Sequence, residues 1–175
     1  SDVCSSDLTD KTVWASPSPD ESQIALLRSE TSNPNLGDIW VLDLKRNVEP
    51  RLTTGGAVRV SSNTGVVWSP DGKQVAYASG DGLYVEDVGG ASEAKLVKAA
   101  ASRSTYVSDW TPDGKCLVYN DLAGGLYAVA VAGGEAKAQV SPEEKSAERA
   151  QSGRVSPDGR WLAYASLRSG RNEIY

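Results

Sequence analysis

The stretch at positions 68–79 reads Trp68-Ser69-Pro70-Asp71-Gly72-Lys73-Gln74-Val75-Ala76-Tyr77-Ala78-Ser79, and a similar sequence occurs three more times in the chain. The other copies occupy positions 110–119, 155–164 and, in the most degraded form, 17–26. The prolines that mark the four copies stand at positions 19, 70, 112 and 157, so successive steps are 51, 42 and 45 residues. The 175-residue chain is therefore organised as one structural unit that recurs along its length.

Each copy is centred on a tetrad of the type Ser-Pro-Asp-Gly, which is a turn for physical reasons. Proline fixes φ at the second turn position, Asp bonds back to its own backbone, and Gly takes positive φ without steric cost. Apolar or β-branched stretches flank the tetrads, for example Val66–Trp68 before the second one and Gln74–Ala78 after it. Two strands joined by a tight turn predict a β-hairpin. The alternative is that each tetrad Asp binds a metal, but each stands alone and the spacing matches no calcium loop.

A third strand is predicted after each hairpin, and a weaker fourth strand after the third. The third strands are Ile39–Leu44, Leu83–Val88 and Leu126–Val131, and the fourth strands are Pro50–Thr53, Ala94–Lys98 and Ala136–Val140. Four antiparallel strands per unit at this period are typical of β-propeller blades. We therefore predict an all-β fold, a partial (open) β-propeller of about three and a half four-stranded antiparallel blades.

The predicted blades occupy about residues 13–53, 58–98, 106–140 and 154–175, within a partial propeller that covers 9–175. The first blade is lengthened by a polar loop at positions 30–37, which we expect to be exposed. A closed ring of six to eight such blades needs roughly 250–350 residues. We therefore expect the ring to stay open, the fourth blade to be truncated within its third strand, and both end blades to present a bare face and a bare edge.

The first eight residues, Ser-Asp-Val-Cys-Ser-Ser-Asp-Leu, do not belong to the repeat. They match the translation of a sequencing adapter, and we interpret positions 1–8 as a non-native tail on an environmental gene fragment; the alternative is a polar lead-in to the first blade. Excluding the tail removes Cys4 and leaves Cys116 in an apolar run. A lone thiol in such a run is more often a packed side chain than a nucleophile, so no disulfide is expected.

The composition argues against catalysis in this segment. The chain has no histidine, which excludes a Ser–His triad, a Cys–His pair and histidine-ligated zinc. It has no G-x-S-x-G elbow, Walker loop or G-x-G-x-x-G motif. Glu143, Glu144 and Glu148 lie in a polar linker, where carboxylates are usually solvated rather than acid–base pairs. We predict no catalytic residue, no metal and no cofactor.

Charge and hydropathy limit the classes of partner. A net charge of −5 argues against nucleic acid or an anionic membrane surface as partner. The sequence contains no apolar run of about 20 residues, the length that spans a bilayer. We therefore expect no direct membrane contact in this segment.

Three arginines form the candidate ligand site. The loops that enter the innermost strands of a propeller gather around one mouth of its central channel, and here we expect those loops to carry Arg59, Arg103 and Arg149. Three guanidinium groups around a mouth would bind carboxylates or phosphates of a ligand or partner. The alternative is three ordinary loop arginines in solvent.

The repeat resembles the TolB-type, WD-like propeller repeat over about residues 13–175. Its sequence pattern is W-S-P-D-G-K-x-[IV]-A-[YF], followed by [LI]-[YW]-V and a weak fourth strand. The two segments at 153–164 and 169–175 are similar in sequence to the propeller domain of bacterial membrane-anchored serine/threonine protein kinases. The resemblance implies a non-enzymatic, extracytoplasmic binding or scaffold module, tethered through a segment outside these residues. Its partner would be a protein, a peptide, a small ligand or another domain of its parent.

Two alternatives follow from the same repeat. One is the substrate-gating propeller of a prolyl-oligopeptidase-type serine peptidase, whose catalytic domain would follow downstream. The other is TolB itself, with its own amino-terminal domain and an envelope partner protein. Fold resemblance does not decide among these parents, but the flanking coding sequence does.

Overall fold

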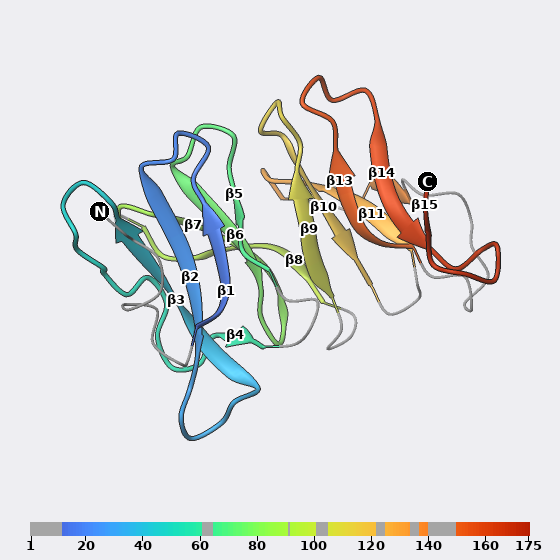
Figure 1. Cartoon of the computed structure of the whole chain (residues 1–175). Helices are drawn as coiled ribbons and strands as arrows, with labels where there is room; N and C mark the ends of the chain where they lie inside the picture. The colour runs from blue at the N-terminus through green and yellow to red at the C-terminus, as the bar shows by residue number, and fades with distance from the viewer. Residues whose placement is uncertain are drawn as a thin grey trace.

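The computed structural model describes residues 12–60, 65–90, 92–100, 105–121, 125–133, 137–139 and 150–175. Within these ranges the chain forms fifteen β-strands and no helix. Figure 1 shows the strands gathered into four twisted sheets that follow one another in chain order. The predicted all-β class and the partial propeller are confirmed.

We call the four sheets blades one to four. Blades one to three each have four antiparallel strands that neighbour one another in sequence order, and blade four has three strands within the described residues. Blade one contains β1 (Thr12–Pro17), β2 (Gln23–Ser29), β3 (Leu36–Asp43) and β4 (Val58–Arg59). Blade two contains β5 (Val67–Trp68), β6 (Gln74–Ala78), β7 (Gly82–Asp87) and β8 (Lys95–Ala99). Blade three contains β9 (Tyr106–Trp110), β10 (Cys116–Asn120), β11 (Leu126–Ala130) and β12 (Lys137–Gln139), and blade four contains β13 (Gln151–Val155), β14 (Leu162–Ser166) and β15 (Glu173–Ile174).

The tetrad turn of blade two joins β5 to β6 through a closed set of hydrogen bonds. The Ser69 hydroxyl donates to Asp71 Oδ1 at 2.7 Å and accepts from the Gln74 amide at 2.9 Å. Asp71 Oδ1 also accepts from the Lys73 amide at 3.2 Å. Gly72 lies at φ +70°, in the left-handed region that glycine enters without steric cost. Each member of the tetrad therefore has a distinct task in the turn.

The remaining tetrads have the same hydroxyl-to-carboxylate bond, at 2.6–2.7 Å, from Ser18 to Asp20, Thr111 to Asp113 and Ser156 to Asp158. The first tetrad departs from the pattern because Glu21 occupies the glycine position at φ 57°. A side chain in this conformation costs roughly 1–2 kcal/mol, since Cβ approaches the following carbonyl oxygen. The first copy, whose sequence departs most from the Ser-Pro-Asp-Gly pattern, therefore also has a strained backbone at this position.

The core lies between the blades, because each sheet packs face to face against the next. One cluster joins blade one to blade two and is made of Ala25, Leu27, Ile39, Val41, Val58, Val66, Trp68, Val75 and Tyr77. A second joins blade two to blade three and is made of Ala76, Ala78, Leu83, Val85, Val97, Val107, Trp110, Leu117, Tyr119 and Val129. A smaller third cluster joins blade three to blade four. Successive residues of β6 face opposite neighbours, which explains why Val75–Ala78 is apolar throughout and does not alternate.

Hydrogen bonds between blades add to this packing. The indole Nε1 of Trp68 in blade two donates to the Ser16 carbonyl in blade one at 2.9 Å. The side-chain amide of Asn120 in blade three donates to the Ala150 carbonyl, just before blade four, at 2.7 Å. Such bonds between residues far apart in sequence fix the order in which the sheets stack.

The predicted boundary between blades one and two is wrong. Val58 and Arg59 were expected to open blade two, but they form β4 and pair with Leu36 and Gly37 at the start of β3. The reason is an interruption at positions 55 and 56, where Gly55 and Gly56 take φ values of +76° and +67°. These glycines let the chain step away from β3 after residue 53 and return to it at residue 58.

The predicted fourth strand of blade one, Pro50–Thr53, also bonds to β3. The Val41 amide donates to the Pro50 carbonyl at 3.0 Å, and the Leu52 amide donates to the Ile39 carbonyl at 2.8 Å. The outer edge of blade one is therefore built from two pieces separated by the glycine step.

Other predicted boundaries lie close to those observed. Blade four begins at Gln151 rather than near Arg154, and its third strand is β15. The loop predicted at positions 30–37 is exposed at residues 31–35, but Leu36 and Gly37 belong to β3 and Gly37 is buried. Cys116 is a half-buried free thiol in β10, while the adapter-like positions 1–8, with Cys4, lie outside the described residues.

Candidate functional site

The three arginines predicted to surround a channel mouth are described only in part. Arg59 ends β4, the outermost strand of blade one, and its side chain is half-buried. Arg59 pairs with Leu36 at the start of β3, and β4 lies at the end of blade one opposite the turn that joins β1 to β2 (Figure 1). Arg103 and Arg149 fall outside the described residues, so the cationic mouth stays a prediction.

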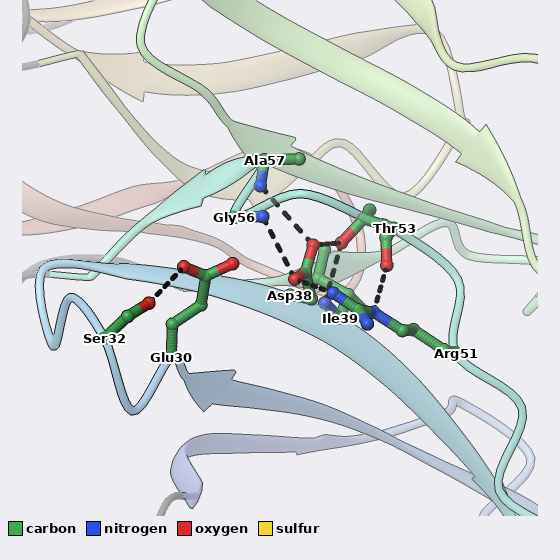
Figure 2. Close-up of polar contacts among 8 residues, drawn as sticks. All are labelled: Glu30, Ser32, Asp38, Ile39, Arg51, Thr53, Gly56 and Ala57. Atoms are coloured by element: carbon green, nitrogen blue, oxygen red, sulfur yellow. Dashed lines mark hydrogen bonds and ion pairs between the residues drawn. The ribbon is translucent and has the colours of Figure 1, made fainter.

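A buried carboxylate with several hydrogen bonds is that of Asp38 in β3, which is 3 % exposed (Figure 2). It forms an ion pair with Arg51 and accepts the Thr53 hydroxyl at 2.9 Å. It also accepts the amides of Gly56 at 3.1 Å and Ala57 at 3.4 Å. The carboxylate is thus surrounded by hydrogen-bond donors. Two of them, the Gly56 and Ala57 amides, are brought to it by the glycine step.

Thr53 and Arg51 tie this carboxylate to the backbone on both sides. The Thr53 hydroxyl accepts from the Ile39 amide at 2.9 Å, and Arg51 Nε donates to the Thr53 carbonyl at 2.9 Å. Buried charge is tolerated when it is paired and hydrogen-bonded in this way. All of these partners belong to blade one, so the cluster holds the outer edge of that blade in place. Nearby, Ser32 donates to Glu30 at 3.3 Å, which orders the start of the exposed loop (Figure 2).

Trp40 extends the same cluster across blade one. The guanidinium carbons of Arg28 and Arg51 lie 5.4 and 5.6 Å from its ring centroid, within the range of cation–π attraction. Arg28 is also paired with Glu49 at 2.7 Å. The arginines of this face are thus engaged with partners inside the blade.

A second buried carboxylate, Glu86, lies on β7. The Tyr77 hydroxyl donates to Glu86 Oε2 at 3.0 Å, and burial raises the pKa of Glu86, opposed by that hydrogen bond. Burial, followed by the charge of Glu86, raises the pKa of Tyr77 well above its usual range. Glu86 pairs with Val75, while the corresponding pairs of blades one and three are Ile24 with Leu42 and Leu117 with Val129. Sequence analysis missed Glu86, and an acidic residue at a strand position that is apolar in the other copies was the signal.

The tetrad turns lie together on one rim of the molecule. Figure 1 shows the turns that join β1 to β2, β9 to β10 and β13 to β14 on the same side, drawn at the top. The turn of blade two joins the row, because a Cβ at Gly72 would lie 3.7 Å from Pro19 in blade one. We call this side the tetrad rim.

The tetrad rim is hollowed between blades two and three. A groove of about 370 Å³ opens there, lined by Ser69, Pro70, Asp71 and Gln74 of blade two and by Trp110, Pro112, Asp113 and Gly114 of blade three. Hydrogen bonds from Ser69 and the Lys73 amide hold the pKa of Asp71 below its usual value. Thr111 and the Lys115 amide do the same for the pKa of Asp113. Two ionised carboxylates therefore flank this groove at neutral pH.

The described ranges contain no group of three or more His, Cys, Asp and Glu side chains that could hold a metal ion. No helix among the described residues is long and apolar enough to cross a bilayer. The groove on the tetrad rim is the feature that we take as the candidate binding site.

The fold can now be compared with known proteins. No protein-family model matches the sequence, and no curated protein matches it. Among solved structures, TolB from Acinetobacter baumannii superposes with a TM-score of 0.74 at 22% identity, over 94% of this chain and 40% of that one. The fold is that of a TolB-type β-propeller.

Two further structures set the breadth of this likeness. A TolB-type protein from Agrobacterium tumefaciens has a TM-score of 0.69 at 23% identity, covering 91% of this chain and 55% of that one. An oligogalacturonate lyase from Vibrio parahaemolyticus has a TM-score of 0.63 at 15% identity, covering 91% and 48%. The TolB-type propeller described here thus spans between 40% and 55% of the length of these structures. At such identities the likeness concerns the fold, and one fold serves both TolB and a lyase.

Proposed function

We propose that this chain is a non-enzymatic binding or scaffold module, part of a TolB-type propeller that recognises a protein, a peptide or a small ligand. The observation that carries the proposal is the groove on the tetrad rim between Asp71 and Asp113. Concave sites with a few fixed polar groups are where folded domains commonly bind ligands. The rigid sheets on either side hold the two turns in place, which limits the ordering cost of binding.

The same proposal assigns the module to an extracytoplasmic protein, tethered through a segment outside these residues. The similarity of fold to TolB supports this location. The sequence of blade four supports it too, because it resembles that of propellers in membrane-anchored serine/threonine kinases. In such a parent the module would be the sensor. The flanking coding sequence tests the assignment: a kinase catalytic loop followed by an apolar span of about 20 residues is expected upstream.

The gating propeller of a serine peptidase is the alternative parent. It predicts a G-x-S-x-G motif and a late histidine downstream of these residues. Finding these motifs would replace the sensor assignment, while the proposed binding role of the rim would still have to be tested separately.

The binding role itself is tested with the 175-residue chain immobilised in its folded form. A peptide-display library is selected on it, and recovered sequences are retested against the same chain unfolded in urea. We expect a consensus sequence that binds the folded chain only. Failure to enrich any sequence above an uncoated surface, across several libraries and a panel of small ligands, would refute the binding role.

A further inference from the structure

The groove on the tetrad rim has three properties that together specify a ligand. The first is its shape: it lies across the boundary of two blades, with Pro70 on one side and Pro112 on the other. These rings and the edge of Trp110 give it apolar walls of the kind against which an aliphatic side-chain stem packs. The groove is therefore suited to a long side chain with a polar end.

The second property is negative charge with unused acceptor capacity. In both Asp71 and Asp113, oxygen Oδ1 is occupied by the hydroxyl and the amide of its own turn. Oxygen Oδ2 is engaged only at long range, 3.9 Å from Lys73 and 3.7 Å from Lys115. These lysine side chains are about four-fifths exposed, and such surface pairs contribute little energy. Each carboxylate can therefore accept a stronger donor.

The third property is an aromatic residue, Trp110, among the residues that line the groove. Trp110 is 5 % exposed, and its indole N–H finds no acceptor among the described residues. The corresponding Trp68 donates to the Ser16 carbonyl of the preceding blade. A buried donor without a partner is costly, so among the described residues the boundary between blades two and three lacks the indole hydrogen bond that joins blades one and two.

We propose that this groove binds a basic peptide segment of a partner protein, with an arginine side chain placed against Asp71 and Asp113. This inference rests on the proposed binding function and names its site and its ligand class. A planar guanidinium offers five donors and stacks on flat side chains, so it matches two carboxylates beside prolines and an indole. The chain's net charge of −5 favours the approach of a basic partner.

The test uses the 175-residue chain and two short peptides, acetyl-Gly-Ala-Arg-Ala-Gly-amide and the same peptide with citrulline in place of arginine. Citrulline keeps the shape and removes the charge. Binding is followed by NMR titration of the ¹⁵N-labelled indole groups. We expect the arginine peptide to bind at least tenfold more tightly than the citrulline peptide and to shift the Trp110 indole signal most strongly.

Two double variants locate the site. D71N/D113N keeps the carbonyl acceptors of both turns and removes the charges that flank the groove; it should abolish the preference for arginine. D20N/D158N makes the same change of charge in the two tetrads that do not line the groove, and should leave the affinity within twofold. Indole spectra of both variants establish that each one is folded.

Several results would overturn the inference: equal binding of the two peptides, no binding of either, or equal losses in both double variants. The last result would mean that diffuse negative charge, rather than this groove, attracts the peptide. If display selection yields peptides whose binding D71N/D113N does not change, the groove assignment fails and the binding function stands. If selection yields nothing, the function itself fails.

Discussion

Replacing Asp38 by alanine tests the buried polar cluster of blade one. The carboxylate is the acceptor for Arg51, Thr53 and the two amides of the glycine step, and it is almost completely buried. Its removal leaves a guanidinium, a hydroxyl and two amides without their acceptor. Each buried donor left without its acceptor costs about 1–3 kcal/mol, whereas the Arg51 side chain is 39% exposed and can be solvated.

We expect Asp38→Ala to lower the free energy of unfolding by about 3–5 kcal/mol, because the Thr53 hydroxyl and two backbone amides lose their acceptor. Asp38→Asn keeps the shape and one carbonyl oxygen, so its loss should be smaller, about 1.5–3 kcal/mol. Urea denaturation followed by tryptophan fluorescence measures both values. The matched control is Glu93→Gln, which removes one charge from an exposed position and should stay within about 0.5 kcal/mol of the parent.

A loss below about 1 kcal/mol for Asp38→Ala would refute this reasoning, since a saturated buried carboxylate cannot be removed so cheaply. A small loss together with an unchanged denaturant slope would mean that the outer edge of blade one does not depend on this cluster. A changed slope would instead show that the compactness of one of the two states has shifted.

Three further predictions concern the turns and the blade contacts. Glu21→Gly should stabilise the chain by about 1 kcal/mol, because Glu21 lies at positive φ, while Gly72→Ala should destabilise it by about 1–2 kcal/mol; thermal unfolding measures both. Trp68→Phe should cost about 1 kcal/mol more than Trp110→Phe in urea denaturation, because only the Trp68 indole has a hydrogen-bond acceptor among the described residues. The hydrogen bonds from Ser18 and Ser22 lower the pKa of Asp20 from 3.8 to about 2, so its contribution to stability is present above pH 3.8 and is lost as the pH falls toward 2. Melting temperatures between pH 5 and pH 2 should therefore fall less steeply for Asp20→Asn than for the parent. Equal slopes for Asp20→Asn and the parent, equal costs for the two tryptophan variants, or a destabilised Glu21→Gly would each contradict its prediction.

The hairpins were predictable from sequence because their determinants are local. The tetrad turn is fixed by bonds within six residues, such as those between Ser69 and Gln74, and its glycine is required by a positive φ. The flanking strands were predictable for a related reason: a sheet buried on both faces needs apolar residues at successive positions, as in β6.

The features that sequence analysis missed depend on residues far apart in the chain. The glycine step at positions 55 and 56 reads as a linker, but its amides bond to Asp38, which lies 18 or 19 positions earlier. β4 could therefore be placed in blade one only once that contact was known. The same holds for the groove, which exists because the Asp71 and Asp113 turns of different blades meet on one rim.

Equivalent residues in two copies of the repeat can also have different surroundings. Trp68 and Trp110 occupy the same place in two copies of the repeat, yet only the first has a hydrogen-bond acceptor within the described part of the chain. The prediction of an arginine-lined mouth stays a prediction. Arg59 lies on an outer strand, and Arg103 and Arg149 fall outside the described ranges.

The stacking of separate blades is the claim on which the tetrad rim and its groove depend. Nuclear Overhauser effects in the ¹⁵N-labelled chain test it most directly. The account predicts cross-peaks from the Trp68 indole N–H to Ser16 and from the Asn120 side-chain amide to Ala150, contacts that span 52 and 30 positions. It would be contradicted by the absence of both cross-peaks in a folded sample, or by a ladder of cross-peaks that joins β8 to β9 in one continuous sheet.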